Sequence, residues 1–400
     1  MLRSINICLE IVSHMVNNFN KKWDDKYILD RVHAMKDLAV AFSKYGGLLG
    51  KIAQILCVDM EESDVFDQCI PANSVISTEY VLGELMYNPM YIDRLVLDRE
   101  MYKSGSLGQV YKGKLDGSTE VILKVQYRNI RETFDQDFLV IGFLMKYVCS
   151  MGHLINCIED AKTMSEAELD YTNELNNQLT ITEIFKDTQT IHIPRIYPDM
   201  CTNETIVMEY MSDFKSMKDF IKTATTEDKS IVGNHILRFV MELIIGHGIY
   251  YSDSHFGNFL VNDKNELCVL DFGCLDKYDE IRHQHVKNLL KTVYDDDKDA
   301  CIQAYMDIGV LDNGMSQESR DYAYTMTEII TKPFRKPGFK FTAEYCHEVA
   351  YTEVNLMEEW KLPSGLIYLQ KIPWGLFNLL ARLETTVTCM EDIHDRYLKV

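Results

Sequence analysis

Two polar clusters that flank a short apolar stretch constrain the fold of this chain more than any other feature of its 400 residues. The first cluster is Asp253-Ser254-His255-Phe256-Gly257-Asn258, and the second is Asp271-Phe272-Gly273. Between them, Asn258–Val261 and Leu267–Leu270 are predicted to form a short hairpin that turns at Asn262–Asn265. The chain must therefore fold so that one polar loop enters a hairpin and a second polar loop leaves it.

These two loops carry the residue types of a metal–phosphate site. Asn258 and Asp271 offer hard oxygen ligands suited to Mg²⁺, which typically binds few protein groups together with phosphate oxygens. Asp253 is placed to accept a proton from an attacking hydroxyl group or to orient a water molecule. A chance Asp-Phe-Gly is common, but its combination with the upstream cluster favours a functional site over coincidence.

A glycine-rich turn and a lysine within an apolar strand indicate phosphate binding. The turn is Gly105-Ser106-Leu107-Gly108-Gln109-Val110, and the strand is Val121-Ile122-Leu123-Lys124-Val125. Side chains alternate along a strand, which places Lys124 opposite Leu123 and Val125 and under the turn. The buried ammonium group needs an anionic partner. The predicted nucleotide-binding residues are Gly105, Ser106, Gly108, Gln109 and Lys124. The alternative is an exposed lysine on an edge strand.

A predicted helix over 160–185 supplies the anionic partner. It contains Glu166-Ala167-Glu168-Leu169-Asp170-Tyr171-Thr172-Asn173-Glu174, in which Asp170 and Glu174 share a face. One helix can thus offer Glu174 to Lys124 and Glu168 to another partner. Without Lys124, a solvated acidic face would be the better interpretation.

The order of the predicted elements indicates an α+β chain of three parts: a helical extension over 1–100, a β-rich N-lobe over 101–211 and a helical C-lobe over 212–400. Within the N-lobe, Asp116-Gly117 joins the β-rich runs Leu107–Leu115 and Glu120–Gln126, a strong hairpin signal. Further helices are expected over 130–150, 229–249 and most of 285–400, with a loop near 332–340 and strands within 190–211. Near the end of the N-lobe, Glu209 and Met211 would meet the adenine edge of a nucleotide.

Composition narrows the class of partners. The chain has 41 Lys and Arg against 61 Asp and Glu, a net charge of −20, whereas a protein that neutralises nucleic-acid phosphates needs the opposite balance. The 11 cysteines show no zinc-binding spacing, so free thiols in a reducing intracellular compartment are expected. Residues 1–20 lack the apolar run of a signal peptide. The stretch Phe138–Ile155 is predicted to be a buried amphipathic helix rather than a membrane span.

These motifs together resemble those of the UbiB family of atypical kinase-like proteins, also called the aarF-domain or ADCK family. The resemblance covers roughly residues 45–280 and continues more loosely to about 385. The matching segments are Gly46–Gln54 for the family's G-G-x-x-x-K-x-G-Q helix, Ser104–Val110 for its A-A-S-I-G-Q-V loop, Glu120–Tyr127 for its E-V-A-x-K strand, Glu168–Asp170 for its E-x-D motif, Asp253–Asn258 for D-P-H-P-G-N and Leu366–Leu383 for its tail.

The resemblance implies a two-lobed protein-kinase-like fold that binds Mg²⁺ and ATP between its lobes. It also implies that Lys51 and Gln54 lie on a regulatory helix over the cleft, with Lys51 paired to Glu168 of the motif that ends at Asp170. Members of the family behave more as ATPases than as protein kinases and are linked to ubiquinone or other prenyl-lipid metabolism. The expected partners are thus a nucleotide and a prenyl lipid or enzymes of a lipid pathway. The alternatives are a catalytically weak nucleotide-binding scaffold and a true kinase for a small molecule or a protein.

Several residues depart from the family pattern. Ala53 replaces a glycine, Tyr251 stands where a histidine is usual, and Ser254 and Phe256 replace both prolines of the catalytic loop. Gly105 replaces an alanine, which gives the loop more backbone freedom near phosphates. No targeting or transmembrane segment is evident, so a mitochondrial or membrane location follows from the family alone.

Overall fold

The computed structural model describes residues 81, 83, 85, 87–105, 107–127, 130–143, 162, 166–336, 338–349 and 367–399. The chain divides into two compact units, and each is described here by itself. Unit 1 is Met1–Leu179 with Pro194–Tyr210, and unit 2 is Thr180–Ile193 with Met211–Val400. The predicted extension over 1–100 lies mostly outside the described residues, so the predicted domain boundaries stay predictions.

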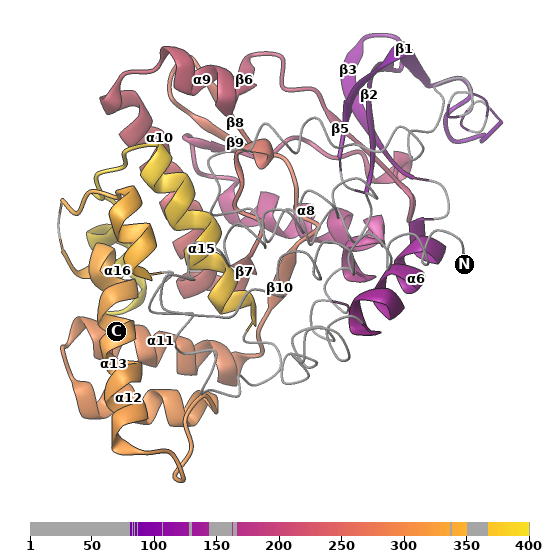
Figure 1. The fold of residues 1–400 in the computed structure, drawn as a ribbon. Coiled ribbons are helices and arrows are strands. Elements are labelled where there is room, and N and C mark those ends of the chain that lie inside the picture. Colours follow the sequence, from indigo (N-terminus) through magenta and orange to yellow (C-terminus); the bar gives the residue numbers. More distant parts are fainter. Residues whose placement is uncertain are drawn as a thin grey trace, which may run out of the picture. The chain divides into compact units, whose positions relative to one another are not determined.

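Unit 1 is built on a four-stranded antiparallel sheet with the order β1-β2-β3-β5 (Figure 1). The strands are β1 (Leu95–Ser104), β2 (Gly108–Leu115), β3 (Thr119–Gln126) and β5 (Thr205–Glu209). The predicted hairpin is confirmed as β2 and β3. Its turn has positive φ at Asp116 (48°) and Gly117 (82°), the conformation that makes Asp-Gly a hairpin signal.

The two faces of β3 differ as the alternation predicts. Val121 and Leu123 are completely buried in the apolar cluster that contains Tyr111 of β2. Lys124 lies on the opposite face, where its strand neighbours are Val110 and Ile206. The predicted orientation of Lys124 relative to Leu123 is therefore confirmed.

The helices of unit 1 correct one prediction. Instead of a continuous helix over 160–185, the chain turns at Leu169 and Asp170 before α8 (Tyr171–Phe185) begins; α8 then continues into unit 2. Gln126 Nε2 and Arg131 Nη2, the latter from α6 (Ile130–Phe143), each donate to the Leu169 carbonyl at 2.8 Å. Asp170 Oδ1 accepts from the Thr172 amide at 3.0 Å, so Asp170 caps the start of α8 instead of sharing a face with Glu174.

Unit 2 contains the hairpin that the polar loops flank. Its four-stranded sheet has the order β4-β9-β8-β6, with β4 parallel to β9 and the other pairs antiparallel. The strands are β4 (Ile191–His192), β6 (Phe214–Ser216), β8 (Phe259–Asn262) and β9 (Leu267–Val269), and a separate pair joins β7 (Ile249–Tyr251) to β10 (Leu275–Lys277). The hairpin predicted from the sequence is confirmed, with Asn265 at φ 63° in its turn.

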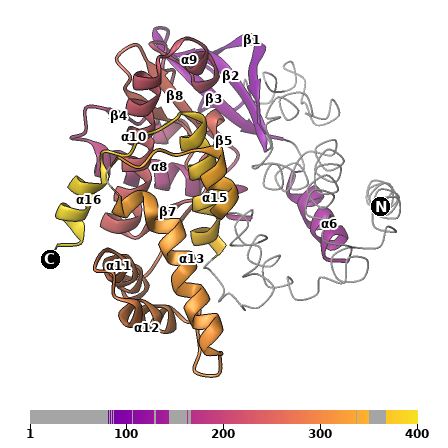
Figure 2. The same cartoon turned by 60° about the vertical axis from the view of Figure 1, so that its left-hand side comes forward.

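The other regular elements described in unit 2 are mainly helices. Short 3₁₀ turns lie at Pro198–Met200 in unit 1 and at Phe256–Asn258 in unit 2. The α-helices are α9 (Met217–Thr223), α10 (Thr226–Met241), α11 (Glu280–Tyr294), α12 (Lys298–Ile308), α13 (Gln317–Arg335), α15 (Ile367–Arg382) and α16 (Met390–Tyr397). Figure 2 shows α11 and α12 side by side with α13 running next to them. The predicted helix over 229–249 ends earlier: α10 passes into a π-helical turn, Glu242–Gly246, and Gly248 at φ 63° leads into β7.

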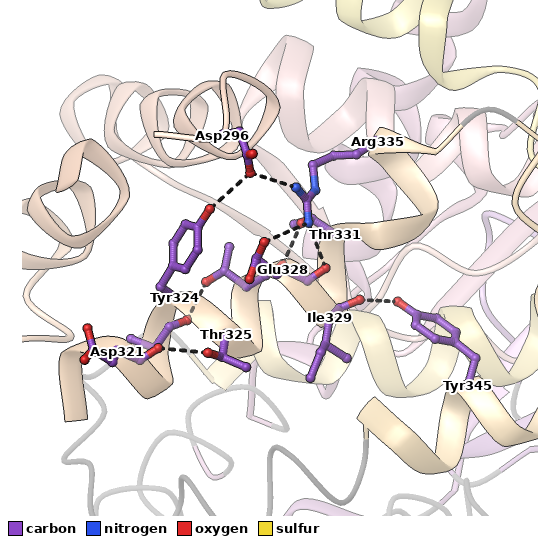
Figure 3. A network of polar contacts seen from close by, with 11 residues as sticks. Asp296, Asp321, Tyr324, Thr325, Glu328, Ile329, Thr331, Arg335 and Tyr345 are labelled. Atoms are coloured by element: carbon purple, nitrogen blue, oxygen red, sulfur yellow. Dashed lines mark hydrogen bonds and ion pairs between the residues drawn. The ribbon is translucent and has the colours of Figure 1, made fainter. Parts of the chain in front are cut away.

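The loop predicted near 332–340 begins later than expected, because α13 continues through Pro333 to Arg335. Proline has no amide hydrogen, so the carbonyl one turn earlier, at Ile329, loses its usual helical partner. Tyr345 Oη donates to that carbonyl at 2.8 Å, as Figure 3 shows. A side chain thus replaces the missing backbone hydrogen bond, which allows the helix to continue.

A polar network ties α13 to the turn between α11 and α12 (Figure 3). Asp296, at φ 57° in that turn, accepts hydrogen bonds from Tyr324 Oη at 3.1 Å and Arg335 Nη1 at 3.3 Å. Glu328 contacts the same guanidinium group at 3.8 Å. None of the helices within the described ranges is long and apolar enough to cross a membrane.

Candidate functional site

The Lys124–Glu174 pair is the centre of the candidate site in unit 1. Lys124 Nζ donates to both carboxylate oxygens of Glu174, at 2.9 and 2.8 Å. The Glu174 side chain is 2% exposed and that of Lys124 is 19% exposed. A carboxylate buried to this degree requires a cation, and the forked contact holds the ammonium group at a fixed position on the sheet. The Tyr171 ring, 4.9 Å from Nζ, adds a cation–π contact.

Close backbone approach explains the glycine at the start of β2. A methyl group at Gly108 would overlap the Val125 carbonyl oxygen, so only glycine fits between β2 and β3 at this position. Gly105 N donates to the Gly108 carbonyl at 2.8 Å, and Tyr127 Oη donates to the Gly105 carbonyl at 3.0 Å. Burial, and secondarily Tyr111, raise the pKa of Tyr127 to about 12, so its phenol stays a donor at neutral pH. These two hydrogen bonds therefore fix the backbone of the loop at Gly105.

The remaining predicted loop residues have different placements. The side chain of Gln109 is completely buried and donates from Nε2 to Met101 Sδ and Tyr111 Oη at 3.1 and 3.2 Å. A side-chain contact from Gln109 to a nucleotide would therefore require these contacts to break. Ser106 lies outside the described residues.

The end of β5 carries the predicted adenine-edge residues. Glu209 exchanges backbone and side-chain hydrogen bonds with Arg195, and the division between the units falls between Tyr210 and Met211. Lys112 Nζ donates to Tyr210 Oη at 2.6 Å and lies 4.1 Å from the Tyr102 ring. The Lys112–Tyr210 contact thus holds β2 against the residue that follows β5.

In unit 2, the loop after β7 brings Asp253 and Asn258 together. Asn258 Nδ2 donates to the Asp253 carbonyl at 2.9 Å and to Asp253 Oδ2 at 3.1 Å. His255 Nδ1 accepts from the Gly257 amide at 2.9 Å, which closes the loop into a short 3₁₀ turn. The amide nitrogen of Asn258 therefore faces Asp253, while its Oδ1 makes no hydrogen bond with the residues that the structure describes.

The β8–β9 hairpin brings the second polar loop to the same place. The Leu270 amide donates to the Asn258 carbonyl at 3.0 Å, directly before Asp271. Asp271 Oδ1 accepts from the Gly273 amide at 2.9 Å, and Phe272 is completely buried in the core of unit 2. The hairpin thus places the backbone of Asn258 beside that of Leu270, directly before Asp271.

This donor set fits Mg²⁺ bound together with phosphate. Mg²⁺ favours one or two oxygen-bearing side chains and completes its shell with water and phosphate oxygens. The described part of the chain has no group of three or more His, Cys, Asp or Glu side chains that could hold a metal ion by themselves.

The predicted regulatory residues are only partly described. Lys51 and Gln54 lie outside the described residues, so their contact with Glu168 stays a prediction. Glu168 itself is 7% exposed, at the turn before α8, and Asp170 caps that helix. The solvated acidic face weighed as an alternative does not describe Glu168 or Glu174, because both are buried.

Three residues beside the candidate loops of the two units were not singled out as site residues from the sequence. Tyr127 donates a hydrogen bond to the Gly105 carbonyl. Its position directly after the strand of Lys124 could have indicated a contact with the glycine-rich loop. Tyr251, noted only as a departure from a family pattern, is completely buried at the end of β7, before the loop that carries Asp253. Gly375 of α15 approaches the catalytic loop so closely that an added methyl group would lie 3.3 Å from the Ser254 carbonyl oxygen, a long-range contact without a local sequence signal.

Comparison with known proteins agrees with this geometry. Residues 95–305, more than half of the chain, match the family model of the ABC1 atypical kinase-like domain. The chain is 28% identical over 62% of its length to the chloroplastic "activity of BC1 complex kinase 8" of Arabidopsis thaliana, and 24% identical over 73% of its length to the mitochondrial atypical kinase COQ8 of Saccharomyces cerevisiae. It spans only 34% and 60% of those two relatives.

A solved structure shows the same fold. It is that of the Mycobacterium tuberculosis protein Rv3197 in complex with erythromycin, with a TM-score of 0.62 at 17% identity, covering 94% of this chain and 98% of the other. The predicted α+β kinase-like fold is therefore confirmed. The family resemblance seen in the motifs is confirmed as well, and the chain belongs to the ABC1 atypical kinase-like family, that of the UbiB and ADCK proteins.

Proposed function

We propose that this protein binds Mg-ATP and acts as an ATPase or phosphotransferase. The observation that carries the proposal is the forked contact from Lys124 to the buried Glu174, because it holds a cation at the end of a glycine-rich loop. In kinase-like proteins the strand lysine that pairs with a helix glutamate contacts the α- and β-phosphates. We assign that role to Lys124, with the backbone at Gly105 and Gly108 lining the phosphates.

The loops of unit 2 supply the rest of the chemistry in this proposal. Asn258 Oδ1 and Asp271 would hold the metal, which when bound neutralises charge on the phosphate oxygens. Asp253 would accept the proton of an attacking hydroxyl group or orient a water molecule. Asn258 keeps Asp253 in place through its two contacts from Nδ2.

The names of the relatives and the free cysteines suggest a metabolic role and a compartment for this protein. The names of these two relatives place them in chloroplasts and mitochondria. We propose a role in prenyl-lipid or ubiquinone-related metabolism, with a prenyl lipid or enzymes of a lipid pathway as partners. The cysteines within the described ranges are free, which is compatible with a reducing compartment.

Thermal unfolding with nucleotides tests the proposal. A ligand that binds only the folded protein raises its melting temperature, so the wild type is compared with Mg-ATP, Mg-ADP and metal-free ATP. Lys124→Ala and Asp271→Asn should both lose a metal-dependent rise. No rise with any nucleotide in a well-folded sample would refute the proposal.

The variant Asp253→Asn separates the catalytic from the scaffold interpretation. If the protein turns over ATP, this change should abolish phosphate release while Mg-ATP still raises the melting temperature. Binding without phosphate release in the wild type would instead favour a nucleotide-binding scaffold. Transfer to an added alcohol or protein would favour a true kinase.

A further inference from the structure

Lys112 of β2 contacts two tyrosine rings on the same face of the sheet as Lys124. Side chains alternate along β2, so Lys112 shares its face with Val110, and Val110 is paired directly with Lys124. Lys112 Nζ lies 4.1 Å from the centre of the Tyr102 ring and 3.9 Å from that of the Tyr210 ring. Each of these ring contacts is a cation–π interaction. The three side chains therefore form one group, the Tyr–Lys–Tyr cluster.

A hydrogen bond and ring packing hold the cluster together. Lys112 Nζ donates to Tyr210 Oη at 2.6 Å, and the rings of Tyr102 and Tyr210 meet edge to face with their centres 6.1 Å apart. The Tyr210 amide donates to the Glu120 carbonyl at 3.1 Å, which holds the backbone of Tyr210 against β3. Because Tyr102 belongs to β1 and Tyr210 follows β5, the cluster links the two outer strands across one face of the sheet.

Lys124 and the Tyr–Lys–Tyr cluster border the same small apolar patch. Ile122 precedes Lys124 by two residues on β3, about 7 Å along the strand, and shares its face. Ile122 is paired with Lys112 on one side and with Met208 on the other. Val110 completes the patch beside Lys124, and both Val110 and Ile122 are only partly buried. A ring that packs on this patch would therefore have the Lys124 ammonium group on one side and the cluster on another.

The sheet becomes strongly charged beyond the cluster. The register of β1 against β2 shifts between Leu97 and Met101, and the bulge there is Asp98-Arg99-Glu100. These residues line an open pocket of about 470 Å³ together with Met101, Tyr102 and Lys112. Packing an apolar ring on charged groups would remove their water without replacing it, which is unfavourable. The cluster therefore marks the outer limit of the apolar patch.

We propose that the Tyr–Lys–Tyr cluster forms the outer wall of the nucleotide base site and selects a purine base over a pyrimidine. The inference deepens the proposed function and rests on it: with the triphosphate at Lys124 and the glycine-rich loop, the base packs on Val110 and Ile122. A purine has two fused rings and extends across the patch to the cluster, whereas a single pyrimidine ring ends before it. Lys112 is a positioning residue in this site, because it acts by fixing Tyr210.

Tyr210→Phe and Lys112→Met test the wall without removing an aromatic ring. Each change removes one partner of the hydrogen bond that fixes Tyr210, while the Tyr102 ring, which is 52% exposed, stays available to stack on a base. A wall that must be ordered when the base binds costs affinity, so both variants should bind Mg-ATP about 3- to 10-fold more weakly. Mg-UTP carries the same triphosphate but does not reach the wall, so its affinity should change by less than about twofold.

The experiment compares full-length wild type, Tyr210→Phe, Lys112→Met and Lys114→Met in calorimetric titrations with Mg-ATP and Mg-UTP at low temperature. Lys114 is the matched control: it is exposed, it follows Lys112 on the same face of β2, and its side chain makes no ion pair or hydrogen bond with the residues that the structure describes. Both nucleotides are measured on each variant. A general loss of stability therefore affects both titrations and cancels in the ratio of the two affinities.

The wild type should prefer Mg-ATP, and only Tyr210→Phe and Lys112→Met should lower that preference. A wild type that binds both nucleotides equally overturns the inference while leaving the proposed function intact. An unchanged preference in either variant also overturns it, and so does an equal reduction in Lys114→Met, which would indicate a general effect of charge. A wild type that binds neither nucleotide overturns the proposed function, and this inference with it.

Discussion

The burial of the Lys124–Glu174 pair predicts an asymmetric response to mutation. Glu174 is 2% exposed and Lys124 is 19% exposed, so the carboxylate is the partner that cannot reach water. Lys124→Met removes the ammonium group from that buried carboxylate, and breaking a buried ion pair from one side typically costs about 3–5 kcal/mol of unfolding free energy. Glu174→Gln leaves an ammonium group that keeps some solvent and the Tyr171 ring at 4.9 Å, so we expect a loss of about 1–2 kcal/mol.

Hydrogen exchange of the β3 and β5 amides measures this difference within unit 1, separately from the stability of unit 2. The double variant Lys124→Met/Glu174→Gln should be more stable than Lys124→Met alone, because it also removes the buried carboxylate charge. The reasoning is refuted if Glu174→Gln costs as much as Lys124→Met, or if the two single effects add in the double variant.

Three further predictions concern the contacts around the site and the core of unit 2. Gly108→Ala should destabilise unit 1 by about 1–3 kcal/mol and weaken nucleotide binding. Gly105→Ala should do neither, because its added methyl group would meet only an ordinary contact at 3.6 Å. Hydrogen-exchange rates measure the stability of both variants, and thermal shifts measure their nucleotide binding. Tyr127 should titrate with a pKa of about 12. Because this pKa is raised in the folded state, the contribution of Tyr127 to the stability of the fold is complete below pH 10 and is lost between pH 10 and 12. Alkaline titration of tyrosinate absorbance in the wild type and in Tyr127→Phe tests this, and a Tyr127 pKa near 10 would contradict it. Tyr345→Phe should cost about 1–3 kcal/mol in urea unfolding by leaving the Ile329 carbonyl without its side-chain donor, and an unchanged midpoint would show that this donor is dispensable.

The order of neighbouring residues was enough to predict the two hairpins and the face of β3 that carries Lys124. The Asp116-Gly117 turn and the hairpin that ends before Asp271 both follow from residues that tolerate positive φ beside apolar runs of period two. The side of β3 that carries Lys124 followed from the same period. The pairing of Lys124 with Glu174 required only one more step, that a buried ammonium group must find an anion.

Two of the errors have a different physical origin, because each depends on a contact distant in sequence. The helix predicted over 160–185 is interrupted at Leu169, whose carbonyl is occupied by Gln126 and Arg131. The helix that passes Pro333 is permitted by a tyrosine from a later segment. No local pattern reports such donors, so the boundaries of these helices could not be predicted.

The loop Asp253–Asn258 shows how tertiary contacts can replace a local constraint. Family members hold this loop with two prolines, each of which fixes a backbone angle, whereas this chain has Ser254 and Phe256 there. Helix α15 supplies the restraint instead: Gly375 lets its backbone approach the Ser254 carbonyl, and the Arg382 guanidinium group lies 4.7 Å from the Phe256 ring. A loop held by proline keeps its angles in isolation, but one held by a helix keeps them only while the helix is packed. The position of Asp253 in this protein therefore depends on a segment more than a hundred residues later in the chain.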